Sequence, residues 1–437
     1  MQCFRIVRSR LAVAAMAGLI VMMSAGLVRA NEAPVALKAA RVFDGVSGKV
    51  IANGVVVVMG GKITAVGRTV PKGAKVIDLG DATLLPGFID SHVHLSMEMS
   101  DNWFKDFRDA ILRFPAEQAH YAARNAEKTL MAGFTTVRDV GSADWQAASL
   151  RNAINAGVIP GPRMLVSNYA IGATGGHGDG TPIPPDRAAP DGPVKGVCNG
   201  AEQCRAAVRF QIKYGADVIK FMPSGGVLSL SDPVDVPELT QDEIDAVISE
   251  AHAWHRKVAA HCHGDLAAQM AIKAGVDSIE HGTFLTAATL RKMKKQGVYL
   301  VPTLFAGDWV GKKADHYPPP VAKKARAAAA QMQATFATAV KIGVPIAFGT
   351  DAGVEPHGRN AHEFSLMVKG GMTPAEALLA ATHNAADLLG VADETGSLTP
   401  GKAADVIAVA GNPLADIKAT GHVVFVMKAG KIYRNAR

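Results

Sequence analysis

The sequence predicts an α/β fold, a (β/α)8 barrel of the TIM type with a small β-sandwich built from both chain termini. Eight short apolar strands alternate with helical segments over roughly 300 central residues, an order typical of parallel sheets covered by helices. Polar residues follow many of these strands, and in a barrel all such strand ends meet at one face. A doubly wound open sheet is the alternative, and the polar residues at so many strand ends argue against it.

The first element is expected to be a signal peptide over residues 1–30. Arginines within the first ten residues precede an almost uncharged apolar stretch over 11–27, and Val28-Arg29-Ala30 offers a cleavage site. An uncleaved membrane anchor is the alternative, because the apolar stretch is nearly long enough to span a bilayer. Cleavage would give a periplasmic or secreted protein without stable membrane insertion.

The charge of the chain excludes one class of partner. Removal of residues 1–30 takes away four arginines and no acidic residue, so the formal charge of +7 falls to +3. This excess is too small to indicate binding to nucleic acid, and no basic stripe with interleaved aromatic residues is present.

The two ends of the mature chain are rich in short strands. We expect residues 31–84 and 398–437 to form the β-sandwich together, because neither segment can bury a core alone. The barrel then spans residues 85–397. The expected strands of the sandwich are Leu37–Phe43, Gly54–Met59, Lys62–Val66, Ala404–Val409, His422–Lys428 and a short run at 430–433.

The barrel elements follow from apolar runs and helical periodicity. The expected strands end near His94, Val137, Val166, Lys220, His261, His281, Thr303 and Thr350. The expected helices include Pro115–Ala132, Glu202–Tyr214, Thr240–His255, Ala322–Ile342 and Thr373–Leu389.

Metal-type ligands stand at several of these strand ends. His92 and His94 are two residues apart in a strand, so their side chains share one face and can hold a metal ion together. Further candidates end the fifth, sixth and eighth strands, namely His261, His281 and Asp351. A single buried histidine is more often a core residue, but a set at corresponding strand ends indicates a metal centre.

Lys220 ends the fourth strand, where a charged ammonium is costly and cannot bind a cation. Reaction of its amine with CO2 would give a carbamate, which is a bidentate ligand able to bridge two metal ions. The alternative is an ion pair with an acid such as Asp351. The sequence alone leaves both open.

The set His92-x-His94, Lys220, His261, His281 and Asp351 resembles the metal-dependent amidohydrolase superfamily in its binuclear, carbamylated-lysine form. The resemblance covers nearly the whole mature chain. Three motifs are similar to the branch that contains prolidase-like dipeptidases, carboxypeptidases acting on Xaa-Arg or Xaa-Lys, and ochratoxin-degrading amidases: Gly175–Asp179, Ser224–Val227 and His261–Gly264.

The resemblance implies a role for each ligand. His92, His94 and Asp351 would hold the more buried ion, His261 and His281 the second, and carbamylated Lys220 would bridge them. Two divalent ions, with zinc favoured by this mixed donor set, would share a hydroxide that attacks the amide carbonyl. Asp351 would also be the catalytic residue that takes the proton of this hydroxide and passes it to the leaving amine.

Four residues are candidates for contact with substrate. His263 shares a face with His261 and could replace it as a ligand, whereas by resemblance it meets the substrate. His177 could hydrogen-bond the substrate or the developing oxyanion, or only stabilise its loop. Arg138 could receive a substrate carboxylate, or pair with Asp139. His357 flanks the loop after the eighth strand and could also reach the site.

The cysteines separate into a pair and an isolated thiol. Cys198 and Cys204 bracket a short loop and could form a disulfide in an oxidising compartment, or remain free thiols. Cys262 points away from His261 and His263 by strand alternation, so we expect an inert core thiol.

The function expected from these observations is hydrolysis of the amide bond of a dipeptide or N-acyl amino acid, including ochratoxin-type amides, by a homo-oligomer. The alternative is a deaminase or a hydrolase of cyclic amides or imides on the same barrel. Deaminases of the superfamily typically lack the bridging lysine and carry a glutamate shortly after the fifth-strand histidine, and this chain differs in both respects. A non-catalytic protein on a retired scaffold should have lost ligands, and all six are present.

Overall fold

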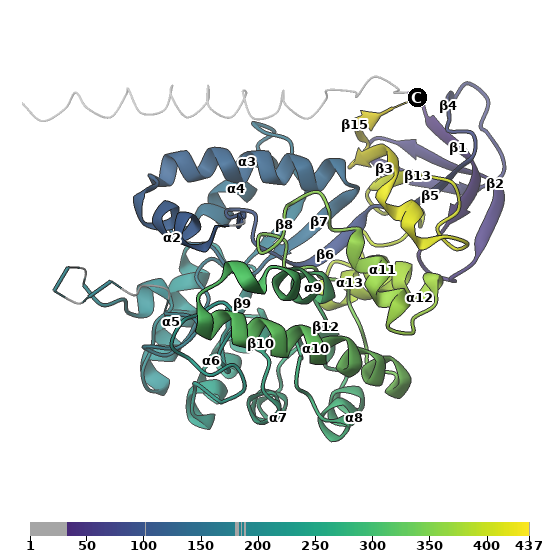
Figure 1. Cartoon of the computed structure of the whole chain (residues 1–437). Helices are drawn as coiled ribbons and strands as arrows, with labels where there is room; N and C mark the ends of the chain where they lie inside the picture. Colours follow the sequence, from purple (N-terminus) through teal and green to yellow (C-terminus); the bar gives the residue numbers. More distant parts are fainter. Residues whose placement is uncertain (1–32, 101, 180–182, 185, 188, 437) are drawn as a thin grey trace, which may run out of the picture.

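The computed structural model describes residues 33–436 except 101, 180–182, 185 and 188. The predicted signal peptide therefore lies outside the described residues. In the described part, no helix is both long and apolar enough to cross a membrane. A sheet made from the two chain ends packs at one side of a larger body of parallel strands and helices (Figure 1).

Strands from both ends of the chain join in one eight-stranded sheet. Its order is β15-β14-β13-β5-β1-β2-β3, and β4 pairs with β1. The junction between the two ends is the antiparallel pairing of β5 with β13, in which Leu84 faces Ala408. The strands are β1 (Val35–Phe43), β2 (Val50–Met59), β3 (Lys62–Gly67), β4 (Lys75–Asp78), β5 (Ala82–Pro86), β13 (Val406–Ala410), β14 (Val423–Lys428) and β15 (Lys431–Asn435).

The expected union of the two termini is thus present, whereas a sandwich of two sheets stays a prediction. Apolar residues of both ends share one core, in which Leu37 and Val56 lie with Val406 and Phe425. The predicted domain limits also stay predictions, and β5 runs across the expected boundary at residue 84.

The central strands form two parallel sheets. One has the order β6-β7-β8 and the other β12-β11-β10-β9. All but one of their residues are buried or half-buried, as expected for parallel strands covered on both faces. The strands are β6 (Phe88–Val93), β7 (Phe134–Asp139), β8 (Arg163–Val166), β9 (Val218–Phe221), β10 (Lys257–Cys262), β11 (Ser278–His281) and β12 (Tyr299–Val301).

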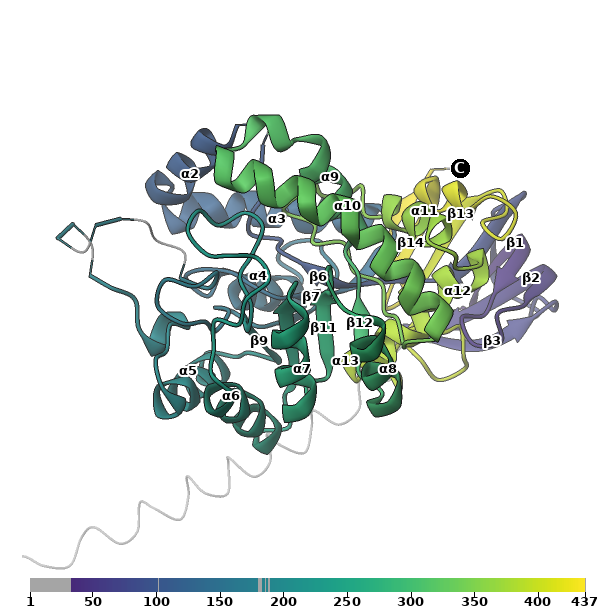
Figure 2. The ribbon, with the colours of Figure 1, turned by 60° about the horizontal axis from the view of Figure 1, so that its bottom comes forward.

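Helices surround these strands (Figures 1 and 2). The α-helices are α2 (Trp103–Leu112), α3 (Pro115–Met131), α4 (Gln146–Asn155), α5 (Ala201–Lys213), α6 (Gln241–Ala253), α7 (Asp265–Ala274), α8 (Ala287–Gln296), α9 (Leu304–Lys312), α10 (Pro319–Ile342), α11 (His362–Lys369), α12 (Pro374–Leu379) and α13 (Ala385–Leu389). Single helical turns lie at Pro193–Lys195, Ala314–His316 and Ile417–Gly421, and a π-helical turn at Ala380–Asn384 joins α12 to α13.

Local sequence signals explain where several helices begin. Thr240 and Glu243 form a capping box at the start of α6, with the Thr240 backbone N–H 2.8 Å from Oε2 of Glu243. Proline begins α3 and α10, where its fixed φ suits the first helical turn. The five helices named from the sequence coincide with α3, α5, α6, α10 and the α12–α13 pair within a few residues.

The eighth expected strand is a segment over residues 345–352 with isolated β-bridges rather than a regular strand. It bridges β12 through Leu300 and Ile346, and β6 through Val93 and Ala352. On its β6 side the Ser91 N–H donates to the carbonyl of Phe348 at 2.8 Å. The segment therefore carries Asp351 to the ends of the parallel strands.

A close approach of backbone to side chain fixes the start of β6. A Cβ atom at Gly87 would lie 1.9 Å from the Thr135 hydroxyl on β7, so only glycine allows the two strands to meet here.

Candidate metal centre

The six predicted ligands line one cavity of about 280 Å³ at the ends of the parallel strands. His92 lies on β6, Lys220 on β9, His261 on β10 and His281 on β11, while His94 directly follows β6 and Asp351 lies in segment 345–352. The structure thus brings together residues up to 259 positions apart, from His92 to Asp351.

Left-handed backbone conformations occur at the ends of three neighbouring strand segments. His281, Thr303 and Asp351 have φ angles of 69°, 48° and 70°. Non-glycine residues rarely adopt this region, and such strain concentrates at functional sites. At His281 and Asp351 the unusual backbone aims a candidate ligand into the cavity.

His92, His94 and Asp351 form the first group. Oδ1 of Asp351 lies 3.3 Å from Nε2 of His92 and 3.2 Å from Nε2 of His94. Burial raises the pKa of Asp351, but the two histidines outweigh this effect and hold it well below its ordinary value. The carboxylate is therefore ionised, as a metal ligand must be.

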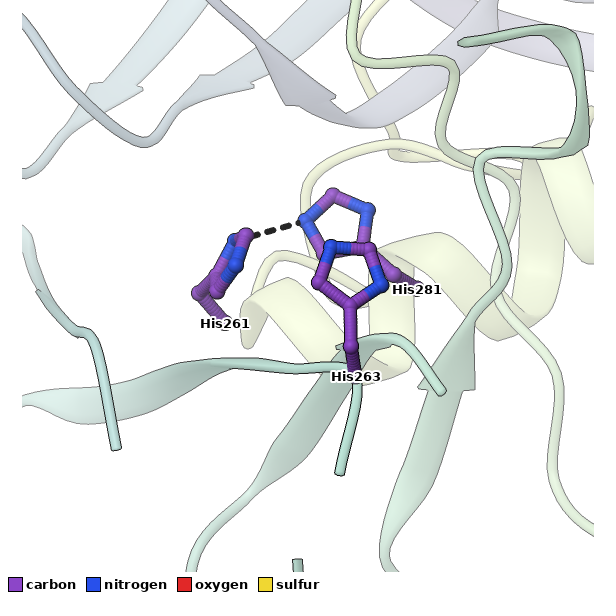
Figure 3. A group of neighbouring side chains, drawn as sticks. All are labelled: His261, His263 and His281. Carbon is purple, nitrogen blue, oxygen red and sulfur yellow. Dashed lines mark hydrogen bonds between the residues drawn. The ribbon is translucent and has the colours of Figure 1, made fainter. Parts of the chain in front are cut away.

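His261, His263 and His281 form the second group (Figure 3). Nδ1 of His261 and Nε2 of His281 face each other at 2.9 Å. The ring of His263 stacks on that of His281 with centroids 4.8 Å apart. Burial lowers the pKa of both His261 and His281 well below the ordinary value, so both rings are neutral and offer lone pairs.

His281 also lies close to the first group. The ligand atoms of His92, His281 and Asp351 lie within 4.8 Å of one another, and those of His261, His263 and His281 do the same, so these two groups of three share His281. Both groups are suited to hold a divalent ion.

Lys220 is buried beside these groups. In the described part of the chain its Nζ contacts Nε2 of His92 at 3.4 Å and makes no ion pair with Asp351. Burial lowers the pKa of Lys220 to about 8, so about a tenth of the amine is uncharged at pH 7. The charges of Glu280 and Asp351 still attract the Lys220 ammonium and raise its pKa, although neither acid forms a close ion pair with it among the described residues.

The sequence of the whole chain places this site in a known group of proteins. The model of the amidohydrolase family matches residues 83–433. An ochratoxinase from Aspergillus niger is 35% identical over 375 residues, which cover 80% of this chain and 75% of the relative. The chain belongs to the amidohydrolase family.

Solved structures agree with this assignment. A Xaa-Pro dipeptidase with methionine bound in its active site is 40% identical, with a TM-score of 0.89 over 92% of this chain and 100% of its own. The crystal structure of the A. niger ochratoxinase is 32% identical, with a TM-score of 0.82 over 92% of this chain and 96% of its own. This amidohydrolase thus lies in the prolidase-like and ochratoxinase branch of a metal-dependent family and hydrolyses amide bonds.

Glu280 is a member of the site that the sequence analysis missed. Its Oε2 accepts a hydrogen bond from Nδ1 of His92 at 2.7 Å, and its Oε1 accepts one from Arg138 at 2.8 Å. Burial raises the pKa of Glu280, but the charge of Arg138 and the bond to His92 lower it to about 2. This carboxylate fixes the tautomer of His92 and turns its Nε2 lone pair toward the cavity.

Arg138 is buried and makes its hydrogen bonds within the protein interior. Its side chain is 2% exposed and also donates to the Ser91 carbonyl at 2.6 Å and the Ser278 hydroxyl at 3.1 Å. Its partner is Glu280 rather than the Asp139 considered from the sequence, and it does not line the cavity. These contacts favour a structural role over capture of a substrate carboxylate.

His177 and His263 line the cavity, as expected for residues that meet the substrate. Nδ1 of His177 lies 3.0 Å from the Ser229 hydroxyl, and Nδ1 of His263 lies 2.7 Å from the Thr283 hydroxyl. Burial lowers the pKa of His177 to about 4 and that of His263 to about 3, so both are neutral hydrogen-bonding groups.

His357 and the cysteines lie away from the cavity. Nε2 of His357 lies 2.8 Å from the carbonyl of Met97, and the residue is absent from the cavity lining. Cys198 and Cys204 are joined by a disulfide with Cα atoms 5.0 Å apart. Cys262 is buried, and burial raises the pKa of its thiol.

Proposed function

We propose that this amidohydrolase binds two divalent metal ions and cleaves the amide bond of a dipeptide or N-acyl amino acid with an apolar side chain. The observation that carries the proposal is the pair of ligand groups that share His281, with Lys220 buried at the same cavity. The names of the similar dipeptidase and ochratoxinase support it.

The residues present fit such ions. Buried neutral imidazoles, an ionised Asp351 and the Glu280–His92 hydrogen bond are the donors and the outer contact that zinc sites use. Bound divalent ions would polarise the scissile carbonyl and lower the pKa of a water molecule. Zinc is the metal that this donor set favours.

Lys220 would complete the donor set as a carbamate. Its uncharged amine would form a bond to the carbon of CO2 and release a proton, which leaves an anionic carboxylate-like group. The lowered pKa of Lys220 supplies the uncharged amine that this reaction needs, because the charged ammonium has no lone pair. The negative charge of the carbamate would also avoid the electrostatic cost of a lysine ammonium beside two metal cations.

The remaining residues would handle protons and the substrate. The Asp351 carboxylate would accept a proton from the attacking water and donate it to the leaving amine. His177 and His263, both neutral, would hydrogen-bond the substrate or the developing oxyanion.

The apolar part of the cavity lining supports an apolar substrate side chain. It is formed by methionine, valine, leucine and alanine side chains, among them Met97, Met222, Val310, Met332 and Val354. Apart from Asp351, no carboxylate stands among the described lining residues. This favours substrates with apolar residues over the Xaa-Arg and Xaa-Lys peptides that other members of the branch cleave.

We also infer that the two parallel sheets and segment 345–352 close into a (β/α)8 barrel. The bridges Ile171–Phe221, Leu300–Ile346 and Val93–Ala352 support closure, since they join the sheet edges in the order a barrel requires. We further propose that the terminal strands form a two-sheet sandwich, that the mature chain is exported and that it forms a homo-oligomer.

A substrate screen tests the function. Zinc-loaded protein is incubated with N-acetyl and dipeptide derivatives of methionine, phenylalanine, proline, arginine and lysine, and products are measured by mass spectrometry. We expect release of the apolar amino acids and little release of the basic ones. Ammonia release from purines or pyrimidines, or hydrolysis of cyclic imides alone, would replace the proposal with the alternative function.

A further inference from the structure

A second cavity opens beside the metal cavity. It measures about 310 Å³ and shares two lining residues, His177 and Leu228, with the metal cavity. One wall is the loop around Gly175–Asp179, another is the loop Leu228–Asp232, and the outer wall comes from α2. His177 and Leu228 therefore border both cavities.

The α2 wall consists of two aromatic rings. The rings of Trp103 and Phe107 are stacked with centroids 5.7 Å apart and planes within 3° of parallel. Both are half-buried, whereas Phe104 on the same helix is 69% exposed. Helix α2 has no buried residue among those described, so packing of the fold does not account for these rings.

The charged groups of the second cavity are already partnered within the protein. Oδ2 of Asp232 accepts the Gly226 N–H at 2.7 Å, and Nζ of Lys324 lies 3.8 Å from its Oδ1. Oδ2 of Asp179 accepts the Gly175 N–H at 2.8 Å. Two carboxylates disfavour an anionic ligand, and their existing partners weaken the attraction for a cation.

We infer that this second cavity is a subsite for a neutral aromatic acyl group of the substrate, packed against the rings of Trp103 and Phe107. The inference rests on the proposed function, in which the scissile amide lies at the metal centre and the amino acid side chain fills the apolar cavity. The acyl group then extends past His177 and Leu228 to α2. A planar ring offers the large apolar contact that the two stacked rings can receive.

The test varies the acyl group at a constant amino acid. N-acetyl-, N-(2-naphthoyl)- and N-(carboxynaphthoyl)-phenylalanine are compared, together with a naphthoyl analogue that carries an ammonium group. We expect the neutral naphthoyl compound to have the lowest KM, and the anionic compound the highest KM of the three naphthoyl compounds. The double variant Trp103→Ala/Phe107→Ala should raise the KM of the naphthoyl compound about tenfold and leave that of the acetyl compound and both kcat values nearly unchanged.

The matched control is Ile111→Ala/Leu112→Ala, which removes two large apolar side chains from the same helix outside the cavity lining. This control should leave the KM of every compound unchanged. Binding of naphthoyl-phenylalanine to the zinc-loaded proteins is also measured by equilibrium dialysis. Absence of hydrolysis in every case would refute the proposed function, while weaker binding by the Trp103/Phe107 variant alone would still support the subsite.

Three results would overturn the inference. The first is an equal loss of naphthoyl affinity in the test and control variants. The second is tighter binding of the ammonium compound than of the neutral one, which would assign the cavity to cations. The third is an equal KM of the parent protein for the acetyl and naphthoyl compounds, which would place the acyl group outside this cavity.

Discussion

Replacement of Glu280 by glutamine should weaken both metal binding and the fold. Glu280 is fully buried and joins Arg138, at 2.8 Å, to His92, at 2.7 Å. Glutamine keeps the shape of the side chain but removes its charge, so the buried Arg138 loses its counter-ion and the acceptor at His92 becomes weaker.

The size of the effect follows from these contacts. Loss of one partner of a buried ion pair costs about 3 kcal/mol or more. Loss of a carboxylate that orients a ligating histidine lowers metal affinity by about 10- to 100-fold. We therefore expect Glu280→Gln to reduce the free energy of unfolding of the metal-free protein by about 3 kcal/mol. Zinc affinity should fall by at least about tenfold.

Two assays and one control measure these effects. Urea unfolding of the metal-free protein reports stability, and competition with a chelator reports zinc affinity. The control is Glu394→Gln, because Glu394 also pairs with an arginine, Arg163 at 2.9 Å, but is 50% exposed. Its loss should cost about 1 kcal/mol or less and leave zinc affinity unchanged. A Glu280→Gln protein with the stability and zinc affinity of the parent would refute the role assigned to Glu280.

Three further predictions concern other parts of the molecule. A Cβ atom at Gly226 would lie 2.1 Å from the His177 ring, so Gly226→Ala should displace His177 and lower kcat/KM about 100-fold. The circular dichroism spectrum should stay unchanged, and activity equal to that of the parent would contradict a role for His177. The disulfide closes a loop with a sequence separation of 6, so Cys198→Ser/Cys204→Ser should lower the free energy of unfolding by about 2 kcal/mol. Urea titration measures this loss, and the parent protein in reductant, which should show the same loss, is the control. The hydrogen bond to Asp277 raises the pKa of His252, so protonated His252 stabilises the fold at low pH, and this stabilisation is lost as pH rises through the folded-state pKa. His252→Ala should therefore lower the free energy of unfolding more at pH 5.5 than at pH 8.5. An equal loss at both pH values would contradict this pairing.

Strand alternation explains why much of the site could be predicted from the sequence. His92 and His94 lie two residues apart at the end of β6 and both reach Oδ1 of Asp351. Apolar runs with a polar residue at the end likewise pointed to Lys220 and His261, and both line the cavity. These residues follow a local rule, so their placement needs no knowledge of the loops.

The same rule could not find Glu280. Alternation places Glu280 and His281 on opposite faces, but His281 has a φ of 69°, and both side chains reach the histidines of the site. A signal was present, since a glutamate in the apolar strand Ser278–His281 needs a buried partner. Its partner Arg138 is 142 positions away, and only the packed fold brings the two together.

The second cavity also depends on tertiary structure. Trp103 and Phe107 are four residues apart on α2, a spacing that indicates one helix face and nothing about what faces it. The loops that complete the cavity come from after β8 and after β9. Their conformations depend on long-range contacts such as the bond from Nζ of Lys324 to the Gly226 carbonyl at 2.6 Å.

The number of divalent ions bound per chain tests the proposed metal centre most directly. Zinc is measured by inductively coupled plasma mass spectrometry after equilibration of the parent and Lys220→Ala proteins with zinc and bicarbonate, and hydrolysis of an N-acyl amino acid is followed in parallel. We expect two ions per chain in the parent, fewer than two in Lys220→Ala, and partial recovery of both metal content and activity on addition of a small carboxylic acid. A parent protein that is fully active without metal, or a Lys220→Ala protein that binds two ions and is as active as the parent, would contradict the account.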